Sequence, residues 1–140
     1  MADRGRFELE GRGSDLAIRV YGPDLTACLA AAVEGLAASL ADVGSDLARR
    51  RLPLEVDGDS PEDLLVGLVD EAILRLDADG DLPVGLTDVA LTQRGLRGML
   101  EVVDLAAARV HGVAPKAATW HEVRLEPVDN TWQGYLMLDL

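Results

Sequence analysis

Two segments of this chain carry apolar residues at the spacing of an α-helix, and short segments with strand-like alternation surround both. In residues 25–40, apolar side chains recur every three or four positions, which places them on one side of a helix. Residues 64–76 repeat this spacing after a serine, a proline and two acids at residues 60–63, a combination that favours a helix start. Helices interspersed with strands in this way bury their apolar sides against a sheet.

The segments around these helices alternate between apolar and polar residues with the period of two that is typical of half-buried strands. In residues 16–20 the apolar side chains share one face, and Asp15, which precedes them, is predicted to point to the opposite face. We therefore predict an α+β fold in two layers, with a mixed or antiparallel sheet packed on two main helices, in a single domain of residues 1–140. The other predicted strands are residues 7–10, 52–56, 84–91, 96–103, 123–126 and 132–138.

The charge balance narrows the choice of partners. Asp and Glu number 25 against 13 Lys and Arg, which gives a formal net charge of −12. Tight, direct nucleic-acid binding is disfavoured, because it depends on basic side chains that displace counterions from phosphates. A cation or a basic protein surface is the better expectation. The three arginines at residues 49–51 are predicted to be the solvated start of a strand rather than an RNA-binding patch.

The sequence also limits where the protein is expected to be located and what its cysteine can do. No segment approaches the roughly 18 apolar residues of a membrane span, and Met1-Ala2-Asp3-Arg4 does not have the pattern of a signal peptide. We therefore expect a cytoplasmic protein. Cys28 is the only cysteine, which excludes an internal disulfide and a cysteine zinc site. It lies among apolar residues of the first predicted helix, so we expect a buried, unreactive thiol.

Two aspartates stand at the ends of apolar segments that are far apart in the sequence. Asp15 precedes residues 16–20, and Asp139 follows residues 135–138. If the fold brings these ends together, the two carboxylates form a site for a divalent cation (Ca²⁺, Mg²⁺ or Mn²⁺), since hard cations prefer carboxylate oxygens and two close anions are costly without a cation. The α-carboxylate at Leu140 would add a third anionic group. The alternative is that each aspartate ends a strand and faces water.

Lys116, the only lysine, and His121 lie in the run Lys-Ala-Ala-Thr-Trp-His. Five positions apart on a strand, they face opposite sides unless a bulge intervenes. No nucleophile signature, zinc motif or phosphate-binding loop accompanies them. Residues 77–81 look like the front of a calcium loop but lack the glutamate at the twelfth position, and we predict a polar helix exit there. These residues by themselves support an acidic α+β domain with a divalent-metal site.

Several segments, in order along nearly the whole chain, resemble the archease family. Residues 14–22, Ser-Asp-Leu-Ala-Ile-Arg-Val-Tyr-Gly, look like the family's opening signature, which is His-Thr-Ala-Asp followed by Ile or Val, Gly, an apolar strand and a glycine. Residues 63–71 are similar to the family's Leu-Leu-Val helix. Residues 116–121 resemble its Lys-Ala-Val-Thr-Tyr-His, and residues 138–140 resemble its closing Val-Asp-Ile.

The resemblance implies a non-enzymatic accessory protein of the RtcB-type RNA ligase, a protein that promotes guanylylation and multiple turnover of the ligase in tRNA splicing and RNA repair. The family's metal-binding aspartates match Asp15 and Asp139, its lysine matches Lys116, and its histidine matches His121. Two alternatives stay open. One is a chaperone-like regulatory module for RNA-modifying enzymes such as tRNA methyltransferases, and the other is a small hydrolase that uses Asp15 and Asp139 as acid and base.

The chain departs from the family pattern at one point. Where the opening signature has His-Thr-Ala, this chain has Arg12-Gly13-Ser14. A guanidinium binds carboxylates in bidentate geometry. Two outcomes are therefore open: Asp15 and Asp139 bind a divalent cation, or Arg12 pairs with one of them and replaces the cation's charge. The sequence does not specify the cation, the ligase surface or the oligomeric state.

Overall fold

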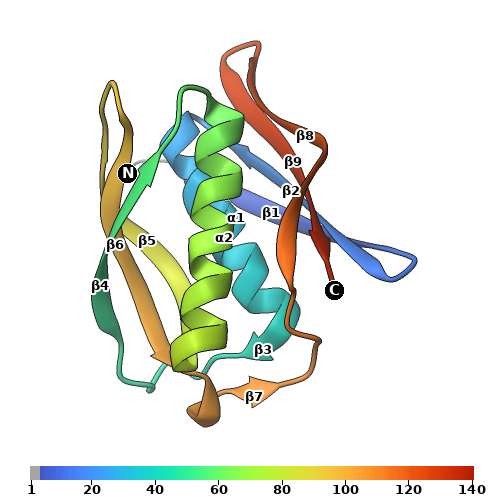
Figure 1. The fold of residues 1–140 in the computed structure, drawn as a ribbon, viewed down its shortest axis with the longest axis vertical. Coiled ribbons are helices and arrows are strands. Elements are labelled where there is room, and N and C mark those ends of the chain that lie inside the picture. The colour runs from blue at the N-terminus through green and yellow to red at the C-terminus, as the bar shows by residue number, and fades with distance from the viewer. Residues whose placement is uncertain (1–3) are drawn as a thin grey trace.

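The computed structural model describes residues 4–140, in which two α-helices lie between two antiparallel sheets (Figure 1). One sheet, called sheet A, has the strand order β1-β2-β9-β8 and contains strands from both ends of the chain. The other, called sheet C, has the order β4-β6-β5 and is formed by the middle of the chain. Sheet A consists of β1 (Arg6–Arg12), β2 (Asp15–Gly22), β9 (Thr131–Asp139) and β8 (Ala117–Val128).

The remaining elements are the strands of sheet C, the two helices, a 3₁₀ turn and a two-stranded ladder. Sheet C consists of β4 (Arg50–Asp57), β6 (Gly95–Asp104) and β5 (Asp81–Leu91). The helices are α1 (Leu25–Leu40) and α2 (Pro61–Asp79), and a short 3₁₀ turn, η1, spans Leu105–Ala107. A further small antiparallel ladder pairs the two residues of β3 (Ala41–Asp42) with the two residues of β7 (Arg109–Val110).

Local capping explains where the helices begin and end. A carboxylate oxygen of Asp24 accepts from the N–H of Ala27 at 2.8 Å, and the hydroxyl of Ser60 accepts from the N–H of Asp63 at 3.1 Å. Each contact satisfies one of the N–H groups that a helix start leaves without an intrahelical partner. At the other end of α2, Gly80 adopts φ 68°, and its left-handed conformation stops the helix. Both predicted helix starts are confirmed, and α2 runs three residues beyond its predicted end at Leu76.

The main core joins both sheets through the helices. Apolar side chains from one face of each sheet meet the apolar sides of α1 and α2, and the α+β class is confirmed. The division of the strands into two sheets is not evident from the sequence, because alternation identifies a strand but not its partners. The largest fully buried side chains of this core are Ile18, Leu29, Leu36, Leu65, Leu68, Leu96, Leu100, Leu125, Leu136 and Leu138.

The helices pack on only one face of sheet A. On β2 and β9 the inward face carries Ile18 and Leu136, which are opposite each other in the ladder and belong to the core. Residues of the opposite parity, such as Arg19 and Tyr135, point to the other face, which we call the outer face. Because no helix of residues 4–140 covers the outer face, its polar groups are candidates for function.

Neither helix in the described part of the chain is long and apolar enough to cross a membrane. The residues Met1–Asp3, for which we predicted no signal peptide, lie outside the described range.

Candidate functional site

Asp15 and Asp139 lie directly opposite each other in sheet A, where β2 begins and β9 ends. The antiparallel register of the two strands pairs their Cα positions, and opposite residues in such a ladder have Cα atoms about 4.5–5.5 Å apart. Their side chains emerge on the same face of the sheet. The fold therefore brings together the two strand ends that carry the predicted carboxylates.

Both carboxylates belong to the outer face. Asp15 is half-buried and has the parity of Ala17 and Arg19, as predicted, whereas Leu16 packs against the core. Asp139 is exposed. Neither aspartate forms an ion pair with a basic side chain of residues 4–140. The pair is thus two facing carboxylates that no described side chain neutralises.

Arg12 lies opposite Asp15 in the β1–β2 ladder, but its side chain is engaged elsewhere. Its Nε lies 3.3 Å from Oε2 of Glu10, and its guanidinium carbon lies 5.9 Å from the centre of the Tyr135 ring. Of the two outcomes left open for Arg12, the described side chains do not show the pairing with Asp15 or Asp139, because Arg12 is paired with Glu10. The reason is that Glu10, two residues earlier on the same strand and face, offers a carboxylate within reach.

Lys116 joins this end of sheet A through its backbone. Its N–H donates to the carbonyl oxygen of Asp139 at 2.7 Å, and Ala117 follows it directly opposite Asp139 in the β8–β9 ladder. The exposed Lys116 side chain borders a cavity of ≈ 470 Å³ that Asp70 and Asp77 of α2 also line. The structure therefore joins the backbone of Lys116 to Asp139, but its side chain borders a cavity on the α2 side of the sheet and not the outer face that carries the two carboxylates.

His121 lies farther from the aspartates, in a break of the β8–β9 ladder. The register is interrupted between Thr119 and Arg124, and Glu122 has φ 59°, an unusual value for a residue other than glycine. The N–H of His121 donates to the hydroxyl of Thr119 at 3.3 Å, and its side chain is exposed. A bulge therefore lies in this stretch of β8, so the rule that residues five apart face opposite sides does not apply to Lys116 and His121. No described contact joins His121 to the aspartate pair.

Two acidic side chains of α2 contact the backbone of β8, and the sequence analysis missed them. Asp70 accepts from the N–H of Ala118 at 2.9 Å, and Glu62 accepts from the N–H of Leu125 at 2.8 Å. Asp70 thereby fixes the segment that carries Lys116. The partners are 48 and 63 residues apart in sequence, so no local pattern identifies them.

The donor set at the aspartate pair fits a divalent cation in part. Carboxylate oxygens are the ligands that Ca²⁺ and Mg²⁺ prefer, but Ca²⁺ takes about six to eight oxygens and Mg²⁺ six. Within residues 4–140, no group of three or more His, Cys, Asp or Glu side chains gathers in a metal-binding arrangement. Asp15 and Asp139 would thus supply two ligands, and water, backbone carbonyls or a partner protein would supply the rest. The contribution of the Leu140 α-carboxylate stays a prediction.

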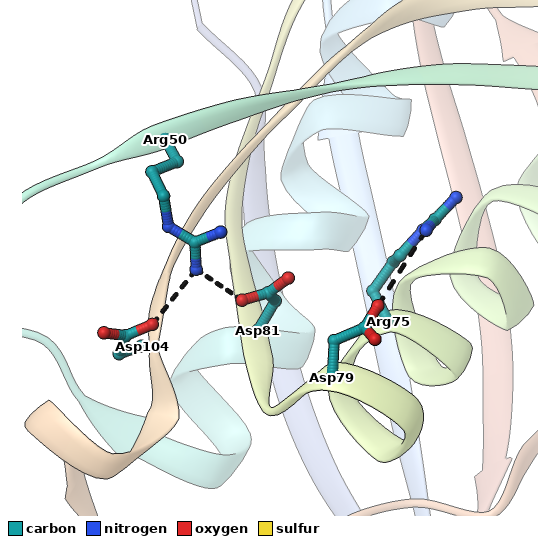
Figure 2. Close-up of polar contacts among 5 residues, drawn as sticks. All are labelled: Arg50, Arg75, Asp79, Asp81 and Asp104. Atoms are coloured by element: carbon teal, nitrogen blue, oxygen red, sulfur yellow. Dashed lines mark hydrogen bonds and ion pairs between the residues drawn. The ribbon is translucent and has the colours of Figure 1, made fainter.

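A second pair of facing aspartates occurs in sheet C, and there an arginine lies between them. Asp81 and Asp104 are opposite each other in the β5–β6 ladder. Figure 2 shows the Arg50 guanidinium reaching both: it donates to Asp81, and it donates to Oδ1 of Asp104 at 3.0 Å. The hydrogen bond with Asp81 is the main reason that the pKa of Arg50 lies above its usual value. A guanidinium of the fold therefore bridges the two carboxylates and offsets one of their two charges.

The position of Asp81 differs from the prediction that residues 77–81 are a polar helix exit. The run of residues 77–81 is a polar helix exit as far as Gly80, but Asp81 is buried, with 7% of its surface exposed. Sequence spacing could not show this, because its partner Arg50 is 31 residues away. The neighbouring arginines of the basic run are also paired, Arg49 with Glu101 and Arg51 with Asp88. The three arginines of residues 49–51 are thus paired with acids of sheet C, and β4 begins among them at Arg50, in agreement with the predicted strand start.

Cys28 is buried in α1 and belongs to the main core. Burial, with a smaller contribution from Asp24, raises the pKa of its thiol to about 11. Because the thiolate is the reactive species, the expectation of an unreactive cysteine agrees with the structure.

Comparisons with known proteins give one consistent result. The family model described as the Archease protein family (MTH1598/TM1083) matches residues 7–140. A relative described as "Probable protein archease" from Mycobacterium tuberculosis is 28% identical over 127 residues, a match that covers 91% of this chain and 70% of the relative.

Two solved structures share the fold. The solution structure of Methanobacterium thermoautotrophicum protein 1598 has a TM-score of 0.73 and 19% identity, and the match covers 96% of this chain and 98% of that one. A crystal structure from Thermotoga maritima, described as "an archease, possible chaperone", has a TM-score of 0.66 and 16% identity over 95% of this chain and 96% of that one.

Proposed function

The chain belongs to the archease family, and on this premise we propose that it is an accessory factor of an RtcB-type RNA ligase. In this role it promotes guanylylation of the ligase and allows repeated turnover in tRNA splicing and RNA repair in the cytoplasm, without being an enzyme itself. The observation that carries the proposal is the register that sets Asp15 against Asp139. These are the two residues that match the family's metal-binding aspartates.

The chemistry of the aspartate pair supports the binding of a divalent cation between Asp15 and Asp139. Two carboxylates on adjacent strands repel each other unless a cation lies between them, and the described part of the chain provides no basic side chain that does so. We propose that Ca²⁺, Mg²⁺ or Mn²⁺ binds Asp15 and Asp139 through their oxygens. Lys116, whose N–H donates to the carbonyl oxygen of Asp139, would then help to hold the strand end that carries this ligand.

The charge of the chain supports a protein partner. A net charge of −12 opposes competition with the ligase for RNA, but it favours docking on a basic surface of the ligase. Such docking activates the ligase only to the extent that it binds one conformation more tightly than another. The acidic character of the chain and the proposed role are therefore compatible.

The experiment is RNA ligation with the ligase from the same source in excess RNA. We expect the wild-type protein to convert a single-turnover reaction into a multiple-turnover one, and Asp139→Ala to abolish this effect while its circular dichroism spectrum stays unchanged. Asp59→Ala serves as the matched control, because it removes an exposed aspartate outside the pair. Equal activation by Asp139→Ala and by the wild type would refute the site assignment.

Cation binding has its own test. Isothermal titration with Ca²⁺, Mg²⁺ and Mn²⁺ should show one saturable site in the wild type and at least tenfold weaker binding in Asp139→Asn, because one of two charged ligands is lost. Unchanged affinity in the variant would place the cation elsewhere in the protein.

A second candidate function is a chaperone-like module that regulates RNA-modifying enzymes. It is favoured by the description of the Thermotoga maritima relative as a "possible chaperone". The two roles differ in a measurable way: a chaperone suppresses aggregation of an unrelated unfolding enzyme such as citrate synthase, whereas a dedicated ligase factor does not. We expect no suppression at equimolar concentration.

A further inference from the structure

Three arginines from three strands surround one tyrosine on the outer face of sheet A. The guanidinium carbons of Arg19, Arg124 and Arg12 lie 4.9, 5.8 and 5.9 Å from the centre of the Tyr135 ring. Arg19 and Arg124 are directly opposite Tyr135 on β2 and β8. The position of the cluster is thus fixed by the strand register and not by flexible loops.

Tyr135 is buried although it points away from the core. Only 3% of its surface is exposed, and it is not part of the core packed against the helices. Since it occupies the outer face, the long side chains around it must cover it. Its hydroxyl is buried and has no hydrogen-bond partner among residues 4–140. A buried hydroxyl without a partner is unusual and calls for an explanation.

The charges around Tyr135 do not balance. The only carboxylate that pairs with the cluster among the described residues is Glu10, which lies 3.3 Å from Arg12 and 3.7 Å from Arg19. Arg124 forms no ion pair within residues 4–140. One aromatic ring and one carboxylate therefore face three guanidiniums, in a chain with a net charge of −12.

We infer that Arg12, Arg19, Arg124 and the Tyr135 hydroxyl form a binding site for an anion of the phosphate class. Guanidinium groups bind phosphate oxygens through pairs of parallel N–H donors, and three of them supply more donors than Glu10 can occupy. The Tyr135 hydroxyl gains a partner when a small movement of the covering arginines admits an oxygen. The inference does not depend on the proposed ligase role or on cation binding at Asp15 and Asp139.

The surroundings select a compact anion over a nucleic-acid strand. Glu8, Glu126, Asp15 and Asp139 occupy the same outer face in the neighbouring positions of the ladders. Their charges repel a polymer that extends beyond the cluster more strongly than they repel a single phosphate held among the three guanidiniums. The site is therefore suited to free phosphate or to the phosphate ester of a nucleotide.

The test is isothermal titration with inorganic phosphate at constant ionic strength, repeated with adenosine 5′-monophosphate. We expect saturable phosphate binding to the wild type, at least tenfold weaker binding to Arg124→Gln, and severalfold weaker binding to Tyr135→Phe, which removes only the hydroxyl. Arg94→Gln, which removes an exposed arginine of the β5–β6 turn, should bind like the wild type.

The outcomes separate clearly. Tighter binding of the nucleotide, with the same dependence on Arg124, assigns the site to a phosphate ester, and equal affinities assign it to free phosphate. An absence of saturable binding to the folded wild type, or equal affinities of the wild type, Arg124→Gln and Tyr135→Phe, would overturn the inference. Both variants change outer-face side chains, so their thermal unfolding should stay cooperative, and ring packing in Tyr135→Phe is retained.

Discussion

The two sheets each set one aspartate against another across neighbouring strands, but only in sheet C does an arginine bridge the pair. In sheet C, Asp81 and Asp104 share the guanidinium of Arg50 (Figure 2). In sheet A, Asp15 faces Asp139 in the same antiparallel relation, and the nearby Arg12 is bound to Glu10 instead. The same local geometry thus occurs once with a built-in cation and once without one.

The difference separates a structural pair from a candidate binding site. Asp81 is buried, and removing a buried carboxylate from water is costly unless a cation and hydrogen bonds compensate. Arg50 provides this compensation, so the sheet C cluster needs no further partner. Asp139 is exposed and keeps its hydration, so the fold tolerates the sheet A pair without an arginine. Because no arginine lies between the two carboxylates, a cation from solution can bind there.

The largest effect is expected from Asp81→Asn. It removes the charge of a buried acceptor from Arg50, and we expect it to lower the free energy of unfolding by about 1.5–3 kcal/mol, because hydrogen bonds to charged groups contribute at this level. Urea unfolding measures the change. Asp104→Asn is the control, since its side chain is 72% exposed and its loss should matter less. Equal stability of the Asp81 variant and the wild type would contradict a structural role.

Ala117→Arg should convert the sheet A pair into the sheet C arrangement. Ala117 is exposed and lies opposite Asp139, so an arginine there can pair with that carboxylate. We expect a gain of about 0.5 kcal/mol in unfolding free energy, within the range of cross-strand ion pairs, and at least tenfold weaker calcium binding by titration calorimetry. Ala117→Gln adds length without charge and should leave calcium affinity unchanged. Full affinity in the arginine variant would argue against a cation between the two aspartates.

The smallest effect is expected from Asp139→Asn in the presence of EDTA. This variant relieves the repulsion with Asp15, and we expect the free energy of unfolding to rise by about 0.3 kcal/mol, since like charges directly opposite on strands are destabilising. Thermal and urea unfolding at low salt measure it. The same chemical change therefore has opposite signs at Asp139 and at Asp81. Destabilisation by Asp139→Asn would show that this carboxylate holds the fold together.

The sequence alone was sufficient for features that depend on neighbours along the chain. The alternation of residues 16–20 gave the face of Asp15, and the serine and proline before residue 62 gave the start of α2, because strand parity and helix capping are local. The position of Asp15 and Asp139 at the ends of two apolar segments suggested that they form a pair, and the family resemblance pointed to the same two residues. The register of β2 and β9 then supplied the geometry.

Features that depend on distant partners were missed, left open or wrong. The sequence left open whether Arg12 pairs with one of the two aspartates, and the structure pairs it with Glu10 on its own strand. Asp81 was predicted to belong to a solvated polar run, because no residue near it in the sequence indicates that Arg50 is its partner. The three arginines around Tyr135 come from three different strands, so they have no common sequence pattern.

The contacts of Glu62 and Asp70 with β8 have a consequence for how this protein behaves at high concentration. β8 is one of the two edge strands of sheet A, and exposed N–H groups of such a strand are a template on which another chain can add a strand. The two carboxylates of α2 occupy N–H groups near both ends of β8, and the irregular segment between them is unsuited to regular pairing. By occupying these groups, a helix of the same molecule removes hydrogen-bond donors that an added strand would need, which disfavours edge-to-edge self-association from this side.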